Sequence, residues 1–100
     1  MINAKEELLE HVEDRKVLAI CIRVGDDCDL EERYYLETNY TVEYWNMFLE
    51  CLDFEYDNDY GTQELFGIIW YADGSWSERY EYDGSECWKH KTCPPIANTY

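Results

Sequence analysis

Basic residues are scarce in this sequence. Its 100 residues include eight Lys and Arg against 23 Asp and Glu, so the formal net charge is −15. From Tyr34 to Glu78 there is no Lys or Arg, although ten acidic residues occur in that stretch. Binding to a nucleic-acid backbone needs clustered Lys and Arg. We therefore expect no direct contact with nucleic acid, and the charge favours a basic partner protein.

A long apolar run is also missing. No stretch approaches the roughly 20 apolar residues that a membrane-spanning helix requires, and the first residues lack the apolar core of a secretory signal. The cysteines form an odd set, which argues against a disulfide framework. They are Cys21, Cys28, Cys51, Cys87 and Cys93. We expect a reduced protein of the cytoplasm without a membrane role.

Signals of catalysis are few. The only histidines are His11 and His90, neither in a recognisable nucleophile context, and there is no glycine-rich phosphate loop. The carboxylates are so numerous that no pair stands out as an acid and base without a cleft to perturb its pKa. We expect no enzyme activity and no cofactor.

The chain does contain enough apolar material for a core. Hydrophobic residues make up 46% of it and aromatic residues 17%, which separates it from acidic disordered chains. Its length fits one domain over residues 1–100.

Two segments have the spacing of amphipathic helices. Asn3, with Glu6 three residues later, resembles a capping box before apolar residues at helical spacing, which predicts a helix over 3 to 14. Thr41 is a suitable N-cap for a second helix over 42 to 53. The stripe that this second helix buries is expected to be Trp45, Phe48, Leu49 and Leu52.

Strands are predicted in the rest of the chain. The apolar run 17 to 24 is typical of a central strand covered on both faces, and the aromatic residues of 33 to 37 favour a second strand. Asp73-Gly74 and Asp83-Gly84 are hairpin signals. They predict a C-terminal meander of strands over 64 to 72, 75 to 82 and 85 to 91.

Two-residue loops at both turns fix the register of this meander. Tyr71 then faces Trp76, Gly67 faces Tyr80 and Glu78 faces Lys89. The same register sets Glu81 against Glu86, which is repulsive. The predicted fold class is α+β, with two helices and a mixed, mainly antiparallel sheet of four to five strands in the order α-β-β-α-β-β-β.

Acidic and aromatic residues alternate from Asp53 to Tyr60, broken only by Asn58. In an extended chain, residues two apart lie roughly 6.6 to 6.8 Å from each other on one face, which is of the order of the phosphate spacing in a nucleic acid. Such a row of carboxylates could imitate a phosphate backbone and occupy the basic groove of a nucleic-acid-binding protein. The alternative is a solvated acidic loop whose tyrosines pack on the domain.

Metal sites are two further alternatives. Asp53, Glu55, Asp57, Asp59 and Glu64 partly fit a calcium loop, but Asn58 replaces its glycine and a strand follows in place of a helix. Cys87, His90 and Cys93 have short, even gaps that suit zinc, with a fourth ligand such as Cys28 or His11. The competing interpretation is a buried Cys87 beside an exposed His90. A third functional alternative is self-association through exposed aromatic strands.

The stretch from Ile69 to Trp88, IWYADGSWSERYEYDGSECW, and the later Cys93-Pro94-Pro95 resemble the C-terminal region of small, mostly uncharacterised proteins of tailed bacteriophages. This resemblance covers about a third of the chain and implies no activity or site residues. In composition the whole chain is similar to acidic phage proteins that block host defences, including DNA-mimic anti-restriction and anti-CRISPR inhibitors.

These observations predict a non-catalytic, phage-type inhibitor that binds a basic, nucleic-acid-binding host protein. Its carboxylates of the 26 to 32 loop and the 53 to 64 segment would make the contacts, with Tyr56 and Tyr60 as desolvated anchors. The predicted contact residues are Asp26, Asp27, Asp29, Asp53, Glu55, Tyr56, Asp57, Asp59, Tyr60 and Glu64. The sequence leaves open whether the chain forms a homodimer.

Overall fold

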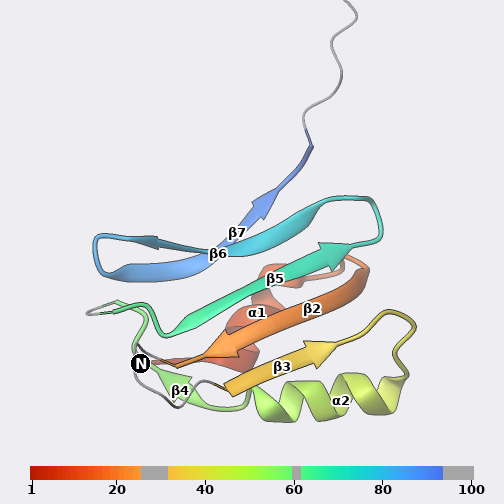
Figure 1. The fold of residues 1–100 in the computed structure, drawn as a ribbon, viewed down its shortest axis with the longest axis horizontal. Helices are drawn as coiled ribbons and strands as arrows, with labels where there is room; N and C mark the ends of the chain where they lie inside the picture. The colour runs from red at the N-terminus through yellow and green to blue at the C-terminus, as the bar shows by residue number, and fades with distance from the viewer. Residues whose placement is uncertain (26–31, 60–61, 94–100) are drawn as a thin grey trace, which may run out of the picture.

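The fold is α+β, with two helices, a five-stranded sheet in the order β3-β2-β5-β6-β7 and a two-stranded sheet of β1 and β4 (Figure 1). The structure is a computed structural model that describes residues 1–25, 32–59 and 62–93. Its elements are β1 (Ile2–Asn3), α1 (Ala4–Val12), β2 (Val17–Val24), β3 (Glu32–Leu36), α2 (Val42–Cys51), β4 (Glu55–Tyr56), β5 (Leu65–Tyr71), β6 (Trp76–Tyr82) and β7 (Ser85–Lys91). The predicted fold class and order of the main elements are confirmed, whereas the small sheet of β1 and β4 was not predicted.

Both helices begin at the predicted caps. The amide of Glu6 donates to Oδ1 of Asn3 at 3.0 Å, and the amide of Tyr44 donates to Oγ1 of Thr41 at 3.2 Å. The helices end at residues 12 and 51, slightly before the predicted 14 and 53. α1 stops because Glu13 takes a left-handed φ of 52°. Within the described residues, neither helix has the length and apolar character needed to cross a membrane.

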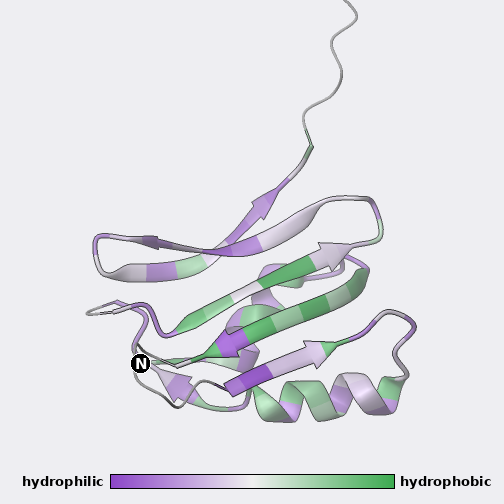
Figure 2. Cartoon of the chain, viewed as in Figure 1, coloured by the Kyte–Doolittle hydropathy of each residue, from purple (hydrophilic) through white to green (hydrophobic). Residues whose placement is uncertain are grey.

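The two helices pack on the same face of the five-stranded sheet. Their apolar side chains join inward-facing residues of the sheet in one buried cluster, whose fully buried members include Leu8, Ile20, Ile22, Leu52, Leu65 and Ile69. Figure 2 shows that the most hydrophobic stretches of the sheet run along β2 and β5. Successive side chains of a strand point to opposite faces. The residues between the buried ones therefore form a second, open face of the sheet.

This one-sided coverage corrects the prediction for β2. Ile20 and Ile22 are buried, but Leu18 on the same strand is 40% exposed. The pairing of β2 with β5 shifts register between Val17 and Ala19, so that Val17 is buried and Leu18 lies at the surface. The prediction of two covered faces was wrong because apolar β-branched residues favour strands even where one face remains partly solvated.

The second hairpin has the predicted register. Tyr82 pairs with Ser85 around Asp83-Gly84, and Glu78 pairs with Lys89. Asp83 and Gly84 both have positive φ, 53° and 87°, as a two-residue hairpin turn requires.

The first hairpin is displaced by one residue from its predicted register. Trp70, not Tyr71, pairs with Trp76, and the Tyr71 amide donates to the carbonyl of Ser75 at 3.0 Å. This pairing leaves three residues, 72 to 74, in the loop. Oδ1 of Asp73 accepts the Ser75 amide at 2.8 Å and so stabilises the wider turn. The predicted pairs of Tyr71 with Trp76 and of Gly67 with Tyr80 were accordingly wrong. The indole that lies against Gly67 belongs to Trp88 on β7.

Candidate functional site

The alternating segment forms a one-sided row of carboxylates. Asp53, Glu55, Asp57 and Asp59 are exposed, whereas Phe54 between the first two is partly buried. Tyr56, the next aromatic residue, is only 5% exposed. The predicted alternation thus places acids outward and rings inward. We call the four carboxylates of Asp53, Glu55, Asp57 and Asp59 the acidic row.

The acidic row is held at both ends. Nδ2 of Asn3 donates to Oδ1 of Asp53 at 2.9 Å, and Nζ of Lys5 lies 3.9 Å from the same carboxylate. In the middle, β4 pairs with β1. At the far end, Oγ of Ser85 donates to Oδ1 of Asp59 at 2.6 Å. The row is therefore ordered by the domain before any partner binds, which lowers the entropic cost of binding.

The helices add further exposed carboxylates on the same side of the sheet. β4 lies there as well, since Tyr56 hydrogen-bonds Glu7 of α1. We define the acidic surface as the row together with the exposed acids of the two helices and of the residues just after α1. Its members are Glu6, Glu10, Glu13, Asp14, Glu43, Glu50, Asp53, Glu55, Asp57 and Asp59. Among the described residues, the cations of the same segments are Lys5 of α1 and Arg15 and Lys16 just after it, and the buried Arg79 lies beneath them against Glu7.

Of the predicted contact residues that the structure describes, Glu64 and Tyr56 do not join this surface. Asp26, Asp27, Asp29 and Tyr60 lie outside the described residues. Glu64 is half-buried, and its amide donates to the Glu86 carboxylate at 2.8 Å. Tyr56 is a core residue, so its predicted role as an anchor for a partner was wrong. The physical reason is that its ring completes the packing of β4 against α1.

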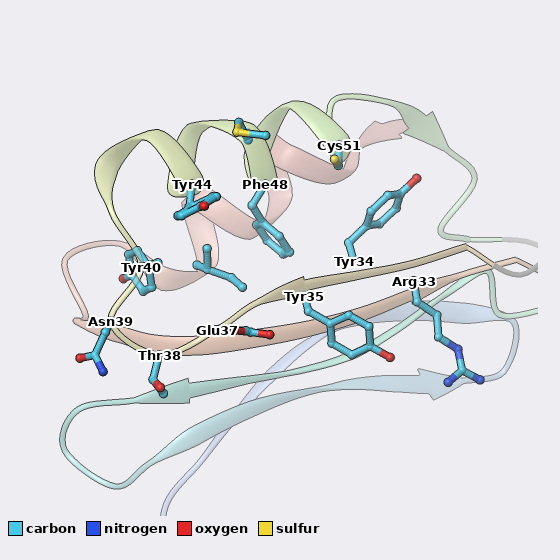
Figure 3. A pocket seen from close by; sticks show the side chains of 12 residues that line it. Arg33, Tyr34, Tyr35, Glu37, Thr38, Asn39, Tyr40, Tyr44, Phe48 and Cys51 are labelled. Atoms are coloured by element: carbon cyan, nitrogen blue, oxygen red, sulfur yellow. The ribbon is translucent and has the colours of Figure 1, made fainter.

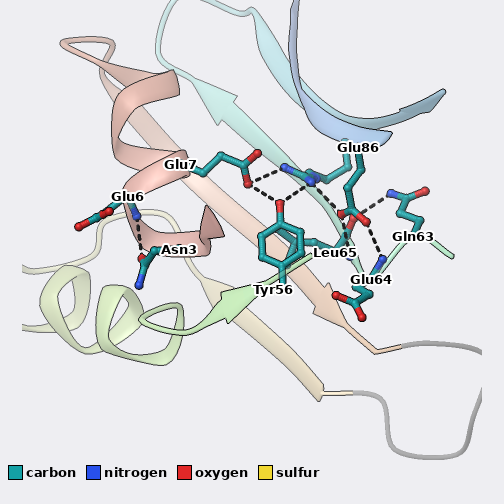
Figure 4. A network of polar contacts seen from close by, with 9 residues as sticks. Asn3, Glu6, Glu7, Tyr56, Gln63, Glu64, Leu65 and Glu86 are labelled. Atoms are coloured by element: carbon teal, nitrogen blue, oxygen red, sulfur yellow. Dashed lines mark hydrogen bonds and ion pairs between the residues drawn. The ribbon is translucent and has the colours of Figure 1, made fainter. Parts of the chain in front are cut away.

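A buried polar network holds Tyr56 in place (Figure 4). Its hydroxyl donates to Oε1 of Glu7 at 2.5 Å and accepts from Nη2 of Arg79 at 2.8 Å. Arg79 also contacts the carboxylates of Glu7 at 3.1 Å and Glu86 at 2.8 Å. Burial and the bond to Glu7 raise the pKa of Tyr56. Burial disfavours the guanidinium charge, but the two carboxylates outweigh it and raise the pKa of Arg79.

This network joins three distant parts of the chain. The side chains of Arg79 and Glu86 are 1% and 3% exposed, and Glu86 also accepts the amides of Glu64 and Leu65. Sequence reasoning missed the network because the chain separation of Glu7, Tyr56 and Arg79 hides it. The network lies beneath the acidic row and is closed to solvent. It therefore stabilises the backbone that carries the row.

The two histidines lie beside serines, in arrangements that do not suit catalysis. Nε2 of His11 lies 2.7 Å from Oγ of Ser77, which also contacts the Tyr71 hydroxyl at 2.7 Å, but Ser77 is 0% exposed. A nucleophile must be reachable by substrate. Burial, and then the positive charge of Arg15, lower the pKa of His11. His90 Nε2 lies 3.0 Å from Oγ of Ser75, a hydroxyl that is itself buried.

The zinc arrangement is wrong on geometric grounds. Cys87 is exposed and pairs with Tyr80 on the open face, whereas His90 points to the helix side and contacts Ser75. Residues three apart on a strand face opposite ways, so Cys87 and His90 cannot share an ion. The expected pattern of a buried Cys87 beside an exposed His90 was also wrong. Cys93, beyond the end of β7, is exposed as well.

The calcium arrangement does not form either. Asp57 Oδ1 accepts the amide of Asp59 at 3.0 Å, Oδ1 of Asp59 accepts from Ser85, and the backbone amide of Glu64 donates to Glu86 of β7. Among residues 1–25, 32–59 and 62–93, no three His, Cys, Asp or Glu side chains gather as a metal ion requires.

A groove of about 590 Å³ lies between β3 and α2 (Figure 3). Its walls include Tyr34, Leu36, Tyr40, Tyr44, Met47 and Phe48. The Tyr34 hydroxyl donates to Glu32, and this bond raises the pKa of Tyr34 to about 12. The groove is aromatic and was not predicted. The predicted stripe does face the core, since Phe48 and Leu52 are buried and Trp45 and Leu49 are partly buried against it. The groove arises beside that stripe, where Tyr44 and Met47 of α2 stay exposed.

No family model matches this chain, and comparison with curated proteins and with solved structures gives no match.

Proposed function

We propose that this protein is a non-catalytic inhibitor of phage type that binds a basic, nucleic-acid-binding host protein through its acidic surface. The observation that carries the proposal is the acidic row: four exposed carboxylates in succession, with the intervening Phe54 and Tyr56 turned into the domain. A partner that normally binds phosphates with Lys and Arg would bind the carboxylates of the row in place of the phosphates. Such binding blocks the real ligand by occupying its groove and needs no reaction, and the cytoplasm of the host would be its place of action.

Preorganisation supports the proposal. The bonds from Asn3 to Asp53 and from Ser85 to Asp59 fix the row at both ends, and the Arg79 network fixes Tyr56 beneath it. A rigid row gives both charge and register, whereas a loose acidic loop gives charge alone.

The test is capture of basic proteins from a bacterial lysate at increasing salt, with two matched variants of equal charge. The row variant carries Asp53→Asn, Glu55→Gln and Asp57→Asn, which keep the hydrogen-bond acceptors. The control variant removes the same charge away from the acidic surface, by Glu37→Gln, Asp73→Asn and Glu78→Gln.

We expect the wild type and the control variant to retain a basic nucleic-acid-binding protein at low salt and to lose it as ionic strength rises. The row variant should bind that protein at least about tenfold more weakly, since the lost contacts are charge-assisted. Equal weakening by both variants would mean that only net charge matters. Capture that is indifferent to salt and to the row would overturn the proposal.

A further inference from the structure

The open face of the five-stranded sheet carries aromatic side chains in its centre. Phe66 and Trp70 of β5 and Trp76 and Tyr80 of β6 lie on this face, and we call these four residues the aromatic strip. Trp70 is 42% and Tyr80 40% exposed, while Phe66 and Trp76 are partly buried. Exposed aromatic patches of this kind mark binding surfaces.

Four of the eight Lys and Arg of the chain flank the strip. On one side Arg23 of β2 pairs with Phe66 of β5 and with Arg33 of β3. On the other side Lys91 of β7 pairs with Trp76 of β6. Lys89 lies two residues from Lys91 on the same face. With strands about 4.8 Å apart, the two cationic margins, β2 and β7, are about 14 Å from each other.

Cations and rings are in direct contact on this face. The guanidinium of Arg23 lies 4.2 Å from the ring centre of Phe66, and Nζ of Lys89 lies 4.3 Å from that of Tyr80. Among the described residues of the five strands, the carboxylate on this face is that of Glu78, which contacts Nζ of Lys91 at 3.1 Å. Asp73 and Asp83 lie at the turns, beyond the ends of the strip.

The charges select an anionic occupant. A second copy packed face to face about a two-fold axis would bring cationic margins against cationic margins, which is unfavourable. Most of the acidic surface lies on the helix side, and the shortest dimension of the molecule is 24 Å. Because this dimension exceeds the Debye length of about 8 Å at physiological ionic strength, salt screens most of the repulsion between those carboxylates and an anion on the open face.

We propose that this open sheet face binds single-stranded nucleic acid. Bases stack on Trp70, Trp76 and Tyr80, and phosphates pair with Lys89 and Lys91, which is how sequence-tolerant single-strand binding works. A duplex fits less well because its bases are already stacked. The expectation of no contact with nucleic acid rested on Lys and Arg that are dispersed in sequence, whereas the fold gathers residues 23, 33, 89 and 91 on one face. This inference is independent of the acidic surface.

The test is titration of fluorescein-labelled oligothymidine and oligouridine, about 15 nucleotides long, followed by anisotropy and by quenching of tryptophan emission. We expect binding with quenching, at least about tenfold tighter for single strands than for a duplex of equal length, because only free bases can stack. The slope of log K against log salt should be about −1.4, as expected for two phosphates neutralised by Lys89 and Lys91 at roughly 0.7 each.

Variants on and off the face locate the site. Trp70→Leu should weaken binding about tenfold, in line with the loss of one stacking partner, and Lys89→Gln should weaken it and reduce the salt slope by about 0.7. Two controls on the helices, Lys5→Gln of α1 and Tyr44→Leu of α2, should change affinity less than about twofold because they lie on the side of the sheet away from the strip. The row variant should retain full oligonucleotide binding, which separates this inference from the proposed function.

Three outcomes would overturn the inference. The first is no binding by a wild-type protein whose circular dichroism shows it to be folded. The second is equal weakening by face and control variants. The third is a wild type that binds no oligonucleotide but self-associates in sedimentation, with the self-association abolished by Trp70→Leu. This result would assign the face to a second copy of the chain.

Discussion

The guanidinium of Arg79 lies 2.8 Å from the carboxylate of Glu86, and both side chains are almost fully buried. Glu86 is the residue expected to repel Glu81 across the second hairpin, and the two do pair. The repulsion is avoided because Glu86 turns into the domain, where Arg79 and two backbone amides neutralise it, while Glu81 accepts the Gly84 amide at 3.0 Å in the turn. A buried charge of this kind is stable only with its partner.

Arg79→Met should therefore destabilise the protein by about 3 to 5 kcal/mol, because it leaves Glu86 buried and unpaired. Urea unfolding followed by tryptophan fluorescence measures this. The control Lys16→Met removes an exposed cation and should change stability by less than about 0.5 kcal/mol. The double variant Arg79→Met with Glu86→Gln should be more stable than the single Arg79 variant. A single variant as stable as the wild type would contradict the burial of the pair.

Gly67→Ala should destabilise the protein by about 1 to 3 kcal/mol through overpacking. An added Cβ would lie 2.5 Å from the Cys21 carbonyl oxygen and 3.2 Å from the Trp88 ring, and the backbone atom cannot move away easily. Gly74→Asn is the contrasting change, since nothing lies within 4 Å of that position and its cost comes only from the φ of 89°, which Asn adopts more readily than most residues. Thermal unfolding of both variants should show the larger loss at position 67.

Stability should fall as pH drops below neutrality, in part through His11. Its pKa in the folded protein lies below the ordinary value of 6.5, chiefly because of burial. Between 6.5 and that lower pKa the unfolded chain binds the proton and the folded chain does not, so stability decreases as pH falls. Unfolding in urea at pH 7.5 and 5.5 should show a smaller loss for His11→Gln than for the wild type. An identical loss in both proteins would show that His11 does not contribute.

Protein purified without chelator should contain substoichiometric zinc and calcium by elemental analysis. The reason is that Cys87 and His90 lie on opposite faces of β7, and that the carboxylates of Asp53 and Asp59 already accept hydrogen bonds from Asn3 and Ser85. The exposed thiol of Cys87 should also react with a thiol reagent at the same rate before and after treatment with EDTA. One tightly bound ion per chain, or a thiol released by EDTA, would contradict this arrangement.

Local signals in the sequence were enough to predict the main elements. Asn3 and Thr41 cap the helices because their side chains reach amides three residues on, and Asp83-Gly84 sets a two-residue turn because both residues accept positive φ. The acidic row also follows from local alternation. The absence of a zinc site could have been predicted, since Cys87 and His90 are three residues apart on a predicted strand.

What the sequence could not predict depends on contacts between distant residues. The two-residue strands β1 and β4 have no periodicity of their own, and they form because Ile2 and Tyr56 meet. The inward turn of Tyr56 depends on Glu7 and Arg79. The cationic margins depend on sheet order, which sets Arg23 and Lys91 on either side of the aromatic strip. The register shift of the first hairpin depends on the hydrogen bond from the Ser75 amide to the Asp73 side chain.

The separation of charge between the two sides of the sheet is tested most directly by amide chemical shifts. Isotope-labelled protein is titrated in one series with an oligoarginine peptide and in another with oligothymidine. The peptide should shift amides of residues 53–59 and of α1, and the oligonucleotide should shift amides of β5, β6 and β7. Perturbation of one shared set of residues by both ligands, or of none, would contradict the two-sided arrangement.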